Sequence, residues 1–179
     1  MFLTLMTAIE IRREAAADAA RIGEITELAF REAAHTCGRE HLLVEVLRNA
    51  GALTLSLVAV LDHEIVGHVA VSPVTVSEAA GDWFGLGPIS VLPQFQRQGI
   101  GSRLMESVLS QLRENGARGC VLVGDPKFYE RFGFRSDHTL IVPGVPPEVS
   151  LSLRFCPCTD HGTVTFHAAF AAALGEPKR

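Results

Sequence analysis

The sequence is poor in several features that would each point to a particular class of protein. Its 179 residues include four cysteines, one tryptophan and one tyrosine, and this cysteine content does not fit a disulfide scaffold of this length. The net charge of −4 at pH 7 argues against a nucleic-acid-binding protein, because such proteins usually carry a basic face. The apolar start, 1–6, is short and lacks a basic segment, so we expect neither a signal peptide nor a membrane span. Both Met1 and Met6 are available as start residues.

The cysteines also argue against a metal site. Cys156 and Cys158 have one residue between them, whereas paired zinc ligands are usually separated by two or more. His161 lies nearby, but no second matching pair exists. Cys120 lies in an apolar run and is expected to be a small core residue. We therefore expect reduced cysteines, Cys37 included, no bound metal and a cytoplasmic protein.

Length and composition indicate one globular domain, because 47% hydrophobic and 20% charged residues are ordinary values. We place this domain at 8–172 and expect flexible termini at 1–7 and 173–179. Periodicity predicts helices at 16–30, 40–49, 99–115 and 126–131, and strands at 8–13, 53–61, 65–76, 83–92, 120–123, 139–142, 149–155 and 164–166. The pattern predicts an α/β fold with a mixed sheet. Gly85, Gly87 and Pro88 inside the strand 83–92 predict a bulge or a close backbone approach.

The stretch 91–103 follows an apolar strand and opens a helix. The helix is marked by apolar residues at every fourth position: Ile100, Leu104, Val108 and Leu112. The first amides of a helix have no partner within it, and the helix dipole adds positive charge there. Gly99 and Gly101 leave room for a ligand beside these amides, and Arg97 and Arg103 add positive charge. This combination predicts a cradle for a phosphate or pyrophosphate group.

Two common phosphate-binding motifs fit this stretch less well. A Walker loop requires a lysine after its last glycine, and none follows a glycine here. A Rossmann fingerprint requires a third glycine or alanine where Leu104 stands, and an acidic residue about 20 residues further on. Asp125 follows the next apolar run, so the Rossmann alternative is weakened and stays open.

The string Gln96-Arg97-Gln98-Gly99-Ile100-Gly101 resembles the Q/R-x-x-G-x-G/A signature of the GNAT N-acetyltransferase superfamily. The segment 124–134 resembles the later Y-x-x-x-G-F helix of that family. Gly67-His68, the segments 72–74 and 124–126, and the stretch 164–170 are similar to the YhbS-like branch of bacterial acetyltransferases. The resemblance covers about 9–170. The cofactor motif is the more specific part.

The resemblance implies a GNAT fold, in which helices flank a mixed and mostly antiparallel sheet. It implies acetyl-CoA as acyl donor and no metal. The pantetheine arm would pair with the central strand at Ile89, Ser90 and Val91, which splays from the next strand. The pyrophosphate would be held by Gln96, Arg97, Gln98, Gly99, Ile100, Gly101 and Ser102. Tyr129 would be the general acid near the cofactor sulfur; a phenol has a pKa of about 10 and stays protonated at neutral pH.

The sequence does not identify the general base. The central strand offers Ser90 as its only polar side chain, and Asp125 is better placed to cap the helix beginning at Pro126. The remaining candidates are His35, His41, His68 and His167. An amine could also lose its proton to water. We expect the acceptor to enter between the first two helices and the late hairpin, near the polar loop 35–41.

Two functions from different classes follow. The first is an N-acetyltransferase that moves an acetyl group to a primary amine by direct attack in a ternary complex, as a monomer or homodimer. The second is a non-catalytic sensor that binds acyl-CoA. Tyr129 and the intact 96–101 turn favour the enzyme, and the missing base leaves room for the sensor. A nucleotide-binding protein conflicts with the absent Walker lysine.

Overall fold

The computed structural model describes residues 8–31 and 37–175. The expectations for 1–7, for 32–36 with His35, and for 176–179 lie outside the described residues. Within the described part, no helix is both long and apolar enough to cross a membrane, and no three His, Cys, Asp or Glu side chains are grouped as metal ligands would be.

One sheet organises the domain. Its main path has the order β1-β2-β3-β4-β5-β8-β6. The strands are β1 (Glu10–Arg13), β2 (Leu55–Leu61), β3 (Glu64–Glu78), β4 (Trp83–Val91), β5 (Gly119–Val123), β6 (Arg135–Ser136) and β8 (Ser150–Arg154). The second half of β3 also pairs with β9 (His161–Phe166), which pairs with β7 (Leu140–Ile141). Along the main path only β4 and β5 are parallel. The predicted mixed, mostly antiparallel sheet is confirmed.

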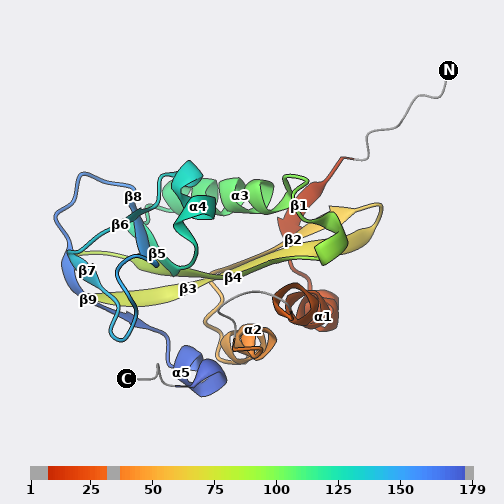
Figure 1. The fold of residues 1–179 in the computed structure, drawn as a ribbon, viewed down its shortest axis with the longest axis horizontal. Coiled ribbons are helices and arrows are strands. Elements are labelled where there is room, and N and C mark those ends of the chain that lie inside the picture. The colour runs from red at the N-terminus through yellow and green to blue at the C-terminus, as the bar shows by residue number, and fades with distance from the viewer. Residues whose placement is uncertain (1–7, 32–36, 176–179) are drawn as a thin grey trace.

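Helices cover both faces of this sheet (Figure 1). One face carries α1 (Ala19–Phe30), α2 (Glu40–Asn49) and α5 (Ala169–Leu174), and the other carries α3 (Ile100–Glu114) and α4 (Pro126–Tyr129). The apolar row expected on α3 is buried, with Ile100, Leu104 and Leu112 each at most 1% exposed. Burial of this row against the sheet supplies most of the helix's stability, because isolated helices of this length are marginal.

The bulge expected from the glycines and proline of β4 is present. The register of β3 against β4 shifts between Val69 and Val71, where one strand has an extra residue. Beyond the shift, β4 keeps its pairing with β3 up to the pair Gly67–Val91. A bulge bends a strand and increases its local twist, so β4 turns away from its other neighbour towards its carboxyl end.

Two elements near the end of the chain were not expected. The two-residue strand β6 pairs with β8, and α5 packs against α2 through Leu43, Leu47, Ala169 and Ala173. The alanine-rich helix has too few large apolar residues for a periodic signal. It reaches Leu174, two residues past the expected end of the domain at 172, and Ala173 is buried.

The expectation of reduced cysteines is wrong for one pair. Cys156 and Cys158 form a disulfide, while Cys37 and Cys120 are free. The turn that follows β8 brings the two Cα atoms to 5.2 Å, within the range that a disulfide spans. The one-residue spacing in the sequence argues against a zinc site but does not test for a disulfide. The conformation of this turn brings the two cysteines together.

Candidate functional site

The parallel strands β4 and β5 diverge towards their carboxyl ends. They pair only at Trp83–Gly119, Phe84–Cys120 and Gly85–Val121. Beyond these pairs β5 pairs with β8 alone, while β4 continues to Val91. One backbone edge of β4, including Ile89, therefore has no strand partner among the described residues. An unpaired edge can hydrogen-bond an extended ligand, and α/β sheets bind ligands at the carboxyl ends of diverging strands.

The turn between β4 and α3 is shaped to present backbone amides. Arg97 and Gly99 have positive φ angles of 60° and 83°, and left-handed residues in such turns direct successive N–H groups into a concavity that suits anions. The Gln96 amide donates to the Val91 carbonyl at 3.0 Å, and the Gln98 amide donates to the Gln94 carbonyl at 3.1 Å. These two side chains hold the turn.

The first residues of α3 complete this concavity. The amides of Ile100, Gly101 and Ser102 lie in the first helical turn, where no carbonyl of the same helix can accept from them. The Ile100 side chain is 1% exposed and belongs to the core, so only its backbone can face a ligand. The seven residues predicted to hold a pyrophosphate thus lie on one continuous turn. Their role stays a prediction.

The aromatic residues of α4 pack against this turn. Phe128 lies beside Gly101: a methyl group at Gly101 would meet the Phe128 ring at 3.4 Å. Phe128 also makes an edge contact with Tyr129 at 4.9 Å between ring centres, and the Arg131 guanidinium lies 5.0 Å from the Phe128 ring centre. Sequence analysis did not select Phe128 or Arg131. The aromatic residue directly before Tyr129 was the available signal.

Tyr129 is the last residue of α4, the helix that follows the carboxyl end of β5. Its ring packs on Gly124, which follows β5, and on Phe134 at 6.0 Å between ring centres. Burial, with smaller contributions from Cys120 and Asp125, raises the pKa of Tyr129 to about 12, so the phenol keeps its proton at neutral pH. Asp125 caps α4 by accepting a hydrogen bond from the Lys127 amide at 3.0 Å, as expected.

Ser90 is fixed by a hydrogen bond on the α1 face of the sheet. Its hydroxyl lies 3.2 Å from the Thr26 hydroxyl, which donates to the Ile22 carbonyl at 2.8 Å. Because Thr26 uses its proton on Ile22, Ser90 is the donor to Thr26. Ser90 is 2% exposed. Its side chain is therefore committed to α1, and its backbone is what could contact a ligand in the gap.

A buried polar network lies beneath α2. The Arg48 guanidinium donates two hydrogen bonds to the Glu14 carboxylate at 2.8 and 2.9 Å, and the Ser56 hydroxyl also donates to Glu14. His68 Nε2 lies 2.7 Å from the Ser56 oxygen. The hydroxyl proton is used on Glu14, so Nε2 carries the hydrogen and Nδ1 has the lone pair. No described group donates to Nδ1.

Burial keeps His68 neutral. Burial lowers its pKa to about 4, against the opposing attraction of Glu14. Burial would raise the pKa of Glu14, but hydrogen bonds from Arg48 and Ser56 outweigh it and lower that pKa. Of the other histidines considered as bases, His167 accepts from the Ala169 amide at the start of α5, and His41 lies beside a groove between α1 and α2.

A pH titration of stability tests the state of His68. The unfolded chain binds a proton near pH 6.5, whereas the folded protein binds it only near pH 4. The free energy of unfolding is therefore expected to fall as the pH drops from 6.5 to 4, by up to about 3 kcal/mol from this residue. Urea denaturation at a series of pH values measures it.

Two variants isolate this contribution. In His68→Gln the part of the slope between pH 6.5 and 4 should disappear, while the loss from carboxylates at lower pH remains. His138→Gln, at an exposed histidine, should keep the wild-type slope. Equal slopes in wild type and His68→Gln would show that His68 is not held neutral.

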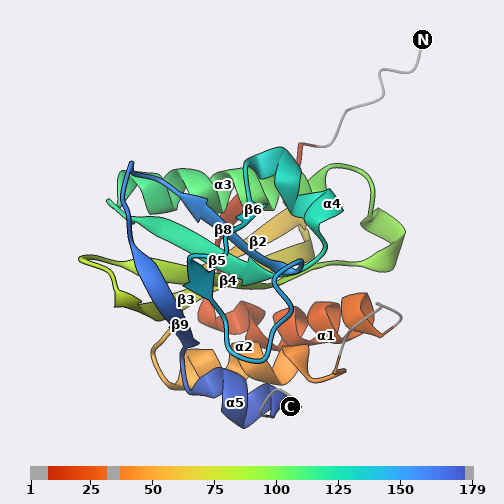
Figure 2. The ribbon, with the colours of Figure 1, turned by 60° about the vertical axis from the view of Figure 1, so that its left-hand side comes forward.

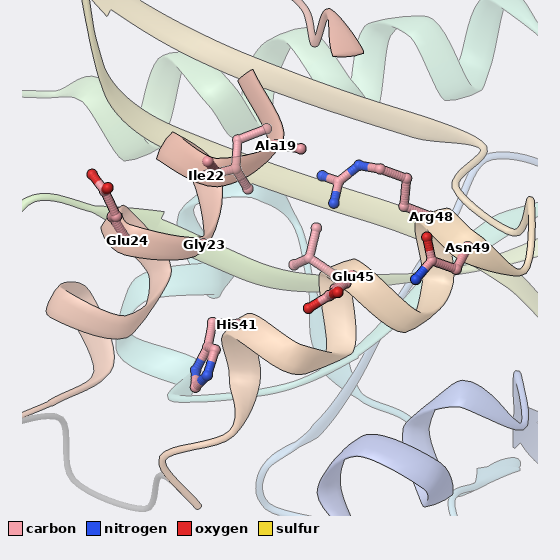
Figure 3. A pocket seen from close by; sticks show the side chains of 10 residues that line it. Ala19, Ile22, Gly23, Glu24, His41, Glu45, Arg48 and Asn49 are labelled. Carbon is pink, nitrogen blue, oxygen red and sulfur yellow. The ribbon is translucent and has the colours of Figure 1, made fainter. Parts of the chain in front are cut away.

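The surface has hollows besides the gap between β4 and β5. One, of about 420 Å³, lies between α1 and α2 (Figure 3). A second, of about 430 Å³, is lined by residues between Asp137 and His161. The residues that line the first hollow belong to α1 and α2. The expected entrance of the acceptor between these helices and the late hairpin stays a prediction.

The chain belongs to the GNAT acetyltransferase family. Residues 53–136 match the family model of the acetyltransferase (GNAT) domain. The chain is 38% identical over 125 residues to an uncharacterized N-acetyltransferase, YhbS of Escherichia coli K12, covering 69% of this chain and 72% of that protein.

Two solved structures have the same fold along most of the chain. A GNAT family acetyltransferase from Brucella melitensis in complex with acetyl-CoA is 46% identical, with a TM-score of 0.81 over 92% of this chain and 99% of that one. E. coli YhbS in complex with CoA is 31% identical, with a TM-score of 0.82 over 95% and 96% of the two chains.

Proposed function

We propose that this protein transfers an acetyl group from acetyl-CoA to a primary amine by direct attack in a ternary complex. The observation that carries the proposal is the gap between β4 and β5, with the amide-rich turn of 96–102 directly after β4 and Tyr129 in the helix that follows β5. The complexes of the two relatives with acetyl-CoA and CoA support the same donor.

Different segments of the chain bind the parts of acetyl-CoA. The free edge of β4 around Ile89 and Val91 pairs with the pantetheine arm. The amides at the start of α3 hold the pyrophosphate, with Arg97 and Arg103 adding positive charge. Amides on the β4 edge face the oxygen that becomes negative during attack. The amine approaches from the face of the sheet that carries α1 and α2.

In the chemical step the neutral amine nitrogen attacks the thioester carbon. A carbon–nitrogen bond forms, the carbon–sulfur bond breaks, and the departing sulfur takes the phenolic proton of Tyr129. The amine proton leaves to water, and water reprotonates Tyr129. We assign no side chain to the amine proton: the Ser90 hydroxyl donates to Thr26, His68 is buried and Asp125 caps α4.

Calorimetry and a thiol-release assay test the proposal together. We expect acetyl-CoA and CoA to bind, ATP and NAD not to compete, and CoA thiol to appear only when a primary amine is added. Thermal protection by ATP or NAD without protection by CoA would overturn the proposal. Binding of acetyl-CoA with no thiol release from any amine would favour the non-catalytic sensor, for which the missing base is the supporting observation.

A further inference from the structure

The groove between α1 and α2 has two different walls. On the α1 side Ala19, Ala20 and Gly23 are small, and Glu24 is the charged residue. Ile22 of α1 and Val44 of α2 also belong to the lining and are each at most 1% exposed. On the α2 side it is polar, with His41, Glu45 and Asn49 following one another along the helix (Figure 3). These three are four residues apart, so they share one helix face over about 12 Å.

The polar wall has unused hydrogen-bonding capacity. The side chains of His41, Glu45 and Asn49 make no hydrogen bond or ion pair with any described residue. All three can accept a hydrogen bond, and an alkylammonium group has three donors and needs acceptors only. The small residues opposite leave room for an aliphatic stem. The lining thus matches an ammonium group on a methylene chain.

The charge of the groove also favours a cation. Arg48 is the basic residue of the lining, and the Glu14 carboxylate neutralises it through the two hydrogen bonds described above. Glu45 adds a second carboxylate near the same guanidinium and contributes to raising the pKa of Arg48, after the larger effect of the hydrogen bond that Arg48 donates to Glu14. Among the described residues Glu24 pairs with Arg21 alone, at 3.1 Å on the exposed surface, where such pairs are weak. The uncompensated charge is negative.

Two hydrogen bonds connect a residue of the groove to β4, the strand of the proposed donor site. Ile22 lines the groove, and its carbonyl accepts from the Thr26 hydroxyl one helical turn further along α1. Thr26 in turn holds Ser90, between Ile89 and Val91 on β4. One turn of helix is about 5.4 Å. Figure 2 shows the end of α1 and the start of α2 on the same side of the domain as α4 and the β4–α3 turn.

We propose that the α1/α2 groove binds a second cationic group of the acceptor, so that the preferred substrates are aliphatic diamines and polyamines. The inference rests on the proposed acetyl transfer and names its substrate class. One amine of the molecule would reach the thioester, while the distal ammonium would lie against Glu45, flanked by His41 and Asn49.

Paired substrates test the inference in the wild-type protein. Acetylation rates are compared for butylamine, 1,4-diaminobutane, 1,6-diaminohexane and spermidine at saturating acetyl-CoA. The inference expects at least one of the diamines or spermidine to exceed butylamine in kcat/KM by about fivefold or more, through a lower KM. This corresponds to about one partly exposed charge pair. The preference should shrink as salt is raised, because salt screens surface charges.

A matched pair of variants locates the effect. Glu45→Gln keeps the shape of the groove and should raise KM for the preferred amine about fivefold, leaving butylamine unchanged. Glu106→Gln removes an exposed carboxylate of α3 on the other face and should change neither. Equal kcat/KM for all four amines, or equal losses for mono- and diamines in Glu45→Gln, would overturn the inference and leave acetyl transfer intact.

Calorimetry separates failure of the groove from failure of the proposed reaction. The same amines are titrated into the CoA-loaded protein. Diamine binding weakened by Glu45→Gln supports the groove even if no amine is acetylated. Absence of diamine binding overturns it, whatever the assay of acetylation shows.

Discussion

Replacing Tyr129 by phenylalanine is expected to lower kcat by about 100-fold, the lower end of what a positioned general acid contributes. The hydroxyl is the only group removed, and the ring contacts with Phe128, Phe134 and Gly124 remain. Acetyl-CoA affinity should therefore stay within about twofold. Steady-state kinetics with a saturating amine and calorimetry with acetyl-CoA measure the two quantities separately.

The pH dependence gives this prediction a second readout. Because burial holds the pKa of Tyr129 at about 12, ionisation of the phenol should not reduce the wild-type kcat between pH 7 and 10. A solvent isotope effect on kcat in the wild type should be smaller in Tyr129→Phe, since the phenolic proton transfer is lost. Wild-type kcat in the variant would exclude Tyr129 as the acid.

Replacing Gly101 by glutamate is expected to weaken acetyl-CoA binding by at least about 100-fold. Gly101 lies in the first turn of α3, where its amide is free and the dipole favours an anion. A glutamate there places its own carboxylate where the pyrophosphate would bind and repels it. The variant should still fold, because an acidic residue in the first turn of a helix is favourable. Calorimetry measures the affinity, and circular dichroism checks the fold.

Gly101→Ala is the matched control. Its methyl group would sit 3.4 Å from the Phe128 ring, an ordinary contact, and Gly101 does not have a positive φ angle. Acetyl-CoA affinity in this variant should remain within about threefold of wild type, since the amide stays available. Unchanged affinity in Gly101→Glu would show that the turn between β4 and α3 is structural and holds no phosphate.

The local elements could be predicted because neighbouring residues determine them. The four-residue spacing that begins at Ile100 indicated α3, and that row is buried. Asp125 before Pro126 indicated the start of α4, and Asp125 caps it. The glycines of β4 indicated a bulge, and the register shifts there. The turn of 96–102 was identifiable for the same reason, since its residues are contiguous.

Contacts between distant segments required the tertiary structure. The divergence of β4 from β5 depends on which residues of the two strands pair. The sequence of neither strand indicates the residue at which this pairing ends. The Ser90 hydroxyl is engaged by a hydrogen bond to Thr26, 64 positions away. His68 lies in a buried network with Ser56 and Glu14, so neither side chain is available as a base. The disulfide depended on the shape of one turn.

The sequence by itself determined the α/β fold, the amide-rich turn and the position of Tyr129. The fold class follows from the order of helices and strands, each of which local periodicity predicts, and the turn and Tyr129 lie in short contiguous motifs. The tertiary structure decided which polar side chains stay available. Arg48 is neutralised by Glu14, whereas Glu45, three residues earlier on the same helix, faces an open groove. Availability depends on hydrogen bonds and charges from other elements, and these meet only when the chain is folded.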